Sequence, residues 1–129
     1  MPLALTYEEP QTFRIRVSGL VTFDEMERMI RVLEQDPHMR GALVLTDARE
    51  ASDAPSSAEL REIAVHAGRL AKNGLGPVAI VVGTTFLYGI ARMFATFAEA
   101  VCMKVNPFRT MPEAEEWLAR EDAARKKSS

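Results

Sequence analysis

The segment Pro77-Val78-Ala79-Ile80-Val81-Val82-Gly83 and the apolar stretch that follows it to Ala100 decide the fold. Residues 78–82 are apolar, mostly β-branched and uncharged, which is typical of a strand buried on both faces. Residues 86–101 then repeat apolar side chains with a helical period, and we expect these to face the sheet: Phe86, Ile90, Phe94, Phe97 and Val101. A buried strand that leads into an amphipathic helix is half of a βαβ unit, so the sequence predicts an α/β fold with parallel strands.

The first half of the chain supplies further elements of the same kind. Residues 3–7 and 12–17 alternate apolar and polar side chains around a short proline-containing turn, which predicts a β-hairpin. The segments Thr22–Glu25 and Ser56–Glu59 match the capping box, so a helix should follow each of them. Between these helices, residues 41–46 predict a second buried strand that ends in a polar stretch.

The last third of the chain predicts an edge strand and a final helix. Residues 101–105 alternate like a strand with one exposed face, which would bury the thiol of Cys102. Thr110–Glu113 is a third capping box, and it should begin the last helix. We expect one domain over residues 1–124 with the element order ββαβαβαβα, followed by a flexible basic tail over 125–129.

Composition excludes several classes of function. The chain has 16 basic and 18 acidic residues and a formal charge of -2, so it lacks the positive field that would recruit nucleic acid. One cysteine and two histidines are too few for a structural metal site or a disulfide framework. No segment has the pattern of a signal peptide or a membrane span. We therefore expect a cytoplasmic protein without a metal or cofactor.

Several segments together resemble one family. They are Val17–Glu25, Val44–Arg49, Tyr88–Phe94, Phe108–Arg109 and Glu113–Leu118. In their order and spacing the chain resembles the SpoIIAA-like family, relatives of the STAS domains found in anti-sigma factor antagonists. The resemblance implies a mixed, mostly parallel sheet with helices packed mainly on one side. It also implies a regulatory or protein-binding module that is not an enzyme, with an anti-sigma-like or kinase-like regulator as its partner.

Ser56 and Ser57 have two interpretations. In phosphoswitched STAS antagonists, a serine within Asp-Ser-Ser-Gly begins the corresponding helix and is phosphorylated. Here Ala54-Pro55 precede the serines and Ala58-Glu59 follow them, so the aspartate and glycine of that motif are missing. The simpler interpretation is a helix N-cap, and we favour it over a phosphosite because Glu59 would repel a phosphate.

Polar residues at the carboxyl ends of the two buried strands form a second candidate site. Asp47, Arg49 and Asp53 follow one strand, and Thr84 and Thr85 follow the other. Ligands of open α/β sheets usually bind at this edge, because neighbouring parallel strands open there together. The alternative is a surface ion pair between Asp47 and Arg49 with loop-capping hydrogen bonds, and we favour it.

The helix after the central strand is a third candidate surface. Tyr88 and Arg92 share a polar face with Glu99, which indicates either a partner contact or a solvated face. The apolar arc covers about half of the circumference, more than the roughly 100° that a core requires, so part of it is available for a homodimer or a lipid-lined pocket. No complete catalytic set is present. The alternative to a regulatory module is a protein that binds a small lipid-like or anionic ligand at the carboxyl edge of the sheet.

Overall fold

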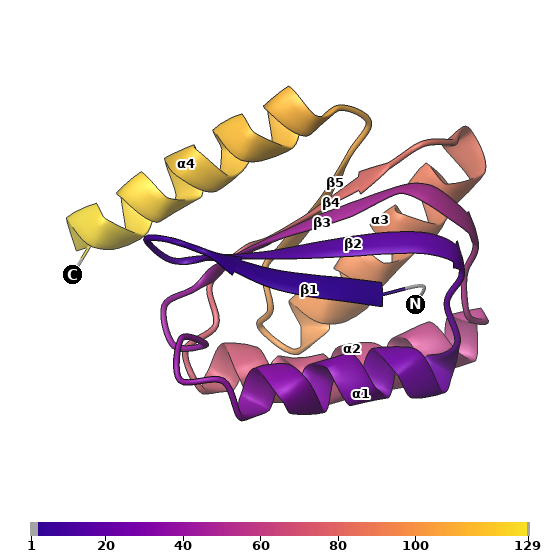
Figure 1. Cartoon of the computed structure of the whole chain (residues 1–129), viewed down its shortest axis with the longest axis horizontal. Coiled ribbons are helices and arrows are strands. Elements are labelled where there is room, and N and C mark those ends of the chain that lie inside the picture. Colours follow the sequence, from indigo (N-terminus) through magenta and orange to yellow (C-terminus); the bar gives the residue numbers. More distant parts are fainter. Residues whose placement is uncertain (1–2, 129) are drawn as a thin grey trace.

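Five strands form one mixed sheet in the computed structural model, which describes residues 3–128 (Figure 1). Across the sheet they lie in chain order: β1 (Leu3–Glu8), β2 (Thr12–Leu20), β3 (Leu43–Asp53), β4 (Val78–Val82) and β5 (Val105–Phe108). β1 pairs antiparallel with β2, and every later pair is parallel. The predicted hairpin and the predicted parallel arrangement of the two buried strands are confirmed.

Four helices cover the sheet, three on one face and one on the other (Figure 1). α1 (Phe23–Glu34), α2 (Ser57–Lys72) and α3 (Thr85–Ala100) each connect two parallel strands, whereas α4 (Met111–Ser128) follows the last strand. Parallel crossovers are right-handed, and the sheet grows in one direction from β2 to β5, so the three connecting helices lie on one face. α4 covers the opposite face, and the predicted order ββαβαβαβα is confirmed.

Local signals set the helix ends. The Thr22 hydroxyl accepts the Glu25 amide proton at 3.2 Å, while the Glu25 carboxylate accepts that of Thr22 at 3.0 Å. Gly74 follows α2 with a φ of +107°, and a Cβ there would lie 2.8 Å from the Arg40 side chain. Only glycine satisfies both constraints, which explains why α2 ends here.

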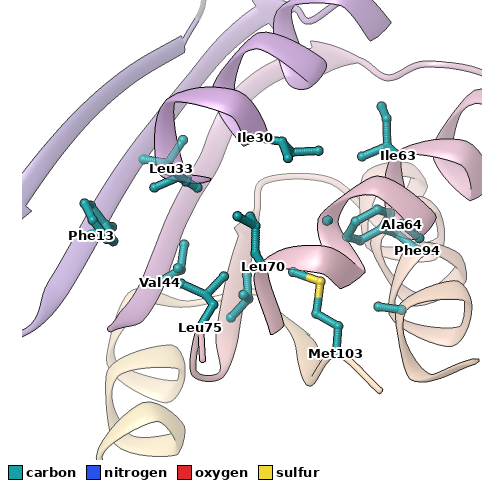
Figure 2. Packing of buried hydrophobic residues seen from close by; sticks show 14 of the residues in the cluster. Phe13, Ile30, Leu33, Val44, Ile63, Ala64, Leu70, Leu75, Phe94 and Met103 are labelled. Carbon is teal, nitrogen blue, oxygen red and sulfur yellow. The ribbon is translucent and has the colours of Figure 1, made fainter. Parts of the chain in front are cut away.

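The two largest of three hydrophobic clusters lie on opposite faces of the sheet. The larger one packs α1, α2 and α3 on β2, β3 and β4, and Figure 2 shows Leu33, Ile63 and Phe94 of the three helices converging on it. The smaller one packs α4 on β3 and β4 through six buried residues: Leu43, Leu45, Ala79, Val81, Ala114 and Leu118. Because successive side chains of β3 and β4 point to opposite faces, each strand contributes residues to both cores, as expected for a sheet covered on both faces.

β3 is longer than predicted. The sequence indicates a strand that ends at residue 46, but β3 continues to Asp53 and pairs with Gly19 and Leu20 at the end of β2. The backbone hydrogen bonds offered by the nine-residue β2 extend the ladder beyond the apolar run. Asp47, Arg49 and Asp53 therefore lie within a strand rather than in a loop.

The predicted strand over 101–105 is wrong by four residues. Val101 and Cys102 belong to the turn that ends α3, and β5 begins at Val105, which is in register with Val78. Cys102 has a φ of +62°, its amide donates to Glu99 at 3.0 Å, and its side chain is exposed. The helix terminus requires a left-handed residue at this position, so the thiol is not buried as predicted.

Two other predictions differ from the structure at helix ends. Phe86 was expected in the core, but it is 63% exposed in the first turn of α3, where Leu87 is buried instead. A flexible tail was expected over residues 125–129, but 125–128 form the last turn of α4, and 129 lies outside the described residues. Arg125 anchors this turn, because its guanidinium donates to the Gly41 carbonyl at 3.2 Å and to Asp122 at 2.8 Å.

Candidate functional site

Asp47 and Arg49 form a bidentate ion pair on β3. Nε and Nη2 of Arg49 lie 2.9 and 2.8 Å from the two carboxylate oxygens of Asp47, and the Arg49 amide donates to the same carboxylate at 3.2 Å. These hydrogen bonds hold the pKa of Asp47 below its ordinary value, and the carboxylate raises the pKa of Arg49. Since the carboxylate is already satisfied within the chain, this geometry favours the surface ion pair over a ligand site.

Asp53 is far from this pair. It lies six residues farther along the extended β3, which corresponds to roughly 20 Å. Its carboxylate accepts the Ala54 amide proton at 2.8 Å and so caps the start of the following loop. Asp47 and Asp53 are therefore too far apart to act together on one small ligand.

Thr84 and Thr85 lie beside β3, at the first turn of α3. The Thr84 hydroxyl accepts the Leu87 amide proton at 3.1 Å as the N-cap, and Arg109 donates to the Thr85 hydroxyl at 3.4 Å. A Cβ on the preceding Gly83 would lie 2.6 Å from the Arg49 carbonyl oxygen. The structure thus brings the threonine loop and Arg49 together at one edge of the sheet, but their polar groups bond within the chain.

Ser56 and Ser57 begin α2 at the same edge. The Ser56 hydroxyl accepts the Glu59 amide proton at 3.2 Å, and the Glu59 carboxylate accepts the Ser56 amide proton at 3.0 Å. Ser57 is exposed and occupies the first helical position. The hydroxyl of Ser56 is therefore engaged as a helix cap, and a phosphate on it would replace these bonds next to a carboxylate.

Tyr88 and Arg92 line an open groove between α3, β5 and α4. The groove has a volume of about 880 Å³, and its lining also includes Lys104 on the approach to β5 and Trp117 of α4. Lys104 forms an ion pair with Glu121 at 2.6 Å. The groove is polar and open, and it contains aromatic and arginine side chains of the kind enriched at protein interfaces.

Two adjoining apolar cavities lie between the sheet and the three helices on its larger face. Each has a volume of about 140 Å³. Six lining residues belong to both cavities: Leu3, Val17, Met26, Thr46, Ile80 and Phe94. The two spaces are therefore parts of one apolar interior that extends from the hairpin to α3.

Incomplete packing is visible at the middle of the sheet. Ile80 is the central residue of β4, yet it is only half-buried, whereas both of its neighbours along the strand are at most a few per cent exposed. Its side chain faces α3 across the cavities. One end of this space reaches the surface at the carboxyl edge of the sheet, where its lining includes Asp53, Ala54 and Pro55.

Sequence reasoning located the edge of the sheet but missed this interior. The lining side chains come from segments far apart in the chain, such as Leu3, Thr46 and Phe94, so no local pattern reveals the space between them. Two signals pointed toward it. One was the apolar arc on α3, which is wider than a core requires. The other was Thr46, the polar residue that directly follows the apolar run Leu43–Leu45 of β3.

Within residues 3–128, no three histidine, cysteine, aspartate or glutamate side chains lie close enough together to hold a metal ion. None of the helices found in the same range has the length and apolar character needed to cross a bilayer.

Comparisons with known proteins agree with the observed architecture. The family model described as SpoIIAA-like matches residues 12–119. An uncharacterized protein of the DUF3478 family from Shewanella loihica, whose crystal structure has a SpoIIAA-like fold, superposes with a TM-score of 0.59. The alignment covers 90% of this chain and 91% of that one at 18% identity, so it shows a shared fold. No curated protein matches the sequence. From the family match and the fold, the chain is a member of the SpoIIAA-like family.

Proposed function

We propose that this protein binds a small apolar molecule between its sheet and the three helices α1, α2 and α3. The observation that carries the proposal is the pair of adjoining cavities of about 140 Å³ each, whose lining is almost entirely aliphatic and aromatic. A cavity of about 150 Å³ with such a lining is large enough to hold benzene. Two adjoining cavities therefore suit a ligand of roughly ten carbon atoms.

The position of the cavities supports a binding role. Ligands of open α/β sheets bind at the carboxyl ends of the strands, and this space reaches the surface at the end of β3, where Asp53, Ala54 and Pro55 line it. Protein interiors contain few voids larger than a water molecule, because empty space forfeits dispersion contacts. A bound ligand would restore those contacts, which accounts for the partial exposure of Ile80.

The test is a binding measurement by isothermal titration calorimetry with n-butylbenzene, a hydrocarbon of about ten carbon atoms that matches the size of the two cavities. We expect saturable binding to the wild-type chain. Ala67 lines one cavity from α2, so Ala67→Leu should fill part of the space and weaken binding at least tenfold. The matched control is Val65→Leu, which places a leucine at a 54% exposed position of the same helix and should leave binding unchanged.

Two outcomes would contradict the proposal. One is the absence of saturable n-butylbenzene binding to the folded wild-type protein. The other is equal binding by Ala67→Leu and Val65→Leu, because it would place the hydrocarbon on the surface rather than in the cavities. If neither outcome is found, native mass spectrometry of the protein purified from its own organism identifies the natural occupant.

A second candidate function is a regulatory module that binds a protein partner, as the family resemblance suggests. The observation that favours it is the groove of about 880 Å³ whose lining includes Tyr88, Arg92 and Trp117. Tyrosine, tryptophan and arginine dominate binding energies at protein interfaces. An anti-sigma-like or kinase-like regulator captured by the wild-type chain but not by Arg92→Glu would support this function, and capture of the same regulator by both would contradict it.

We also propose that the chain forms a homodimer in the cytoplasm. It is supported by the large hydrophobic side chains on the outer faces of the helices, among them Val32 and Val65, which are 50% and 54% exposed. Sedimentation at high micromolar concentration is the measurement that checks it. A monomer under these conditions would contradict the dimer, and Val32→Ser should weaken a dimer that uses this surface.

A further inference from the structure

The polar side chain of Thr46 faces the apolar interior. Along β3, Val44, Thr46 and Ala48 point toward the three helices, while Leu43 and Leu45 pack against α4 on the other face. Thr46 lines both cavities, pairs with Ile80 across the sheet, and is half-buried. It therefore lies at the junction of the two spaces.

The Thr46 hydroxyl makes no hydrogen bond to any residue in the described range 3–128. By contrast, the hydroxyls of Thr22 and Thr84, which cap helices, each accept an amide proton from the following turn. The Thr46 hydroxyl therefore adds no hydrogen bond to the fold, and valine would fill the same volume with an apolar group suited to the apolar lining around it. The position thus carries a polar group that the fold itself does not use.

We propose that the Thr46 hydroxyl binds the single polar group of the ligand, which makes the ligand a neutral amphiphile such as an alcohol or a ketone. This inference rests on the proposed function. A hydroxyl can both donate and accept a hydrogen bond, so it suits either class. The aliphatic part of the ligand occupies the two cavities on either side of Thr46.

Charge in the lining excludes an anionic ligand. Among the described residues, the only charged side chain that lines either cavity is Asp53, at the mouth. No lysine or arginine in the described range contacts these spaces to compensate a buried carboxylate. Asp53 also repels a carboxylate at the entrance, so an alcohol should bind more tightly than the fatty acid of equal length.

The test compares Thr46→Val, which keeps the shape of the side chain, with Thr46→Ser, which keeps the hydroxyl. Direct binding of 1-octanol, octanoate and n-butylbenzene is measured by isothermal titration calorimetry. Thr46→Val should weaken 1-octanol binding roughly fivefold to tenfold and leave n-butylbenzene within about twofold, because one neutral hydrogen bond is lost. Thr46→Ser should retain most of the affinity for 1-octanol, and octanoate should bind at least about tenfold more weakly than 1-octanol to the wild-type chain.

The outcomes separate the two proposals. Equal binding of 1-octanol by the wild-type protein and Thr46→Val, with n-butylbenzene still bound, would overturn the role of Thr46 and leave the apolar site intact. Octanoate binding as tight as 1-octanol would overturn the neutral ligand class. Binding of none of the three compounds to the folded wild-type chain would overturn the proposed function itself. Thr46→Val is expected to fold, with a melting temperature at or above that of the wild type, because it removes an unpaired polar group.

Discussion

The two faces of the sheet differ in how completely helices fill the space above them. On the face covered by α4, Ala79, Val81 and Ala114 are 0% exposed. On the opposite face, Ile80 lies between Ala79 and Val81 in the same strand but remains half-buried above two cavities. Ala79 and Val81 of β4 therefore face a tightly packed core, whereas Ile80 between them faces the core that contains the two cavities.

The difference follows from how each face is covered. α4 packs on β3, β4 and β5, and small residues at the contact, Ala79 and Ala114, allow a close approach. The other face is covered by three helices: α1 is linked to α2 by Glu27–His66 and Glu34–Arg69, and α3 packs beside α2. The side chains that line the space beneath these helices do not fill it. The unfilled face is therefore the one suited to a ligand.

The largest expected change in the free energy of unfolding comes from replacing a leucine by alanine, and this change should be larger on the α4 face than on the opposite face. Leu118→Ala removes a 4% exposed side chain of α4 and should lower the free energy of unfolding by about 2–5 kcal/mol. Leu3→Ala removes a half-buried side chain that borders the cavities and should cost only about 1 kcal/mol. Urea denaturation measures both. Equal losses would mean that the two faces are equally well packed.

The reverse change, adding volume, should sharpen the contrast. Ala79→Val inserts two carbon atoms into the filled face and should destabilise the protein by about 1–3 kcal/mol. Ala48→Val makes the same change on β3 toward the cavities, and its effect should stay within about 0.5 kcal/mol. Thermal unfolding monitored by circular dichroism compares the two variants. A large loss for Ala48→Val would show that no usable space lies beside it.

The attachment of α4 to its face can be tested at Arg125. Its guanidinium donates to the Gly41 carbonyl in a partly buried position, so Arg125→Ala should cost about 1 kcal/mol and increase amide hydrogen exchange in the last turn of α4. Lys127→Ala, at an exposed position one helical turn or less away, is the control and should change stability by under about 0.5 kcal/mol. Unchanged exchange in Arg125→Ala would show that the last turn is held by other contacts.

The smallest effect concerns the part of the α4 face that no helix covers, where Asp47 pairs with Arg49. The pKa of Asp47 is lowered in the folded state, so its contribution to stability is present above the ordinary value of 3.8 and is lost as the pH falls through the lower folded value. Because Arg49 is 51% exposed, this contribution should stay below about 1 kcal/mol. Urea unfolding of wild type and Asp47→Asn between pH 6 and 2.5, roughly, should show a stability difference that shrinks on acidification. A constant difference across this range would contradict the ion pair.

Local signals predicted much of the fold. The strand over residues 78–82 has the bounds that its apolar run indicates, and α1 and α2 begin directly after the capping boxes at Thr22 and Ser56. Predictions failed where a neighbouring segment decides the conformation. β3 extends to Asp53 because β2 pairs with it, and Phe86 is exposed because Leu87 takes the core position in the first turn of α3.

Sequence by itself determined the elements, their order and the parallel sheet, because hydrophobic period and helix caps act between residues that are near in the chain. Only the tertiary structure decided which face of the sheet is tightly packed and that Thr46 faces an apolar interior. Those properties depend on the combined volumes and positions of side chains such as Leu3, Ile80 and Phe94, which come together only when the chain has folded.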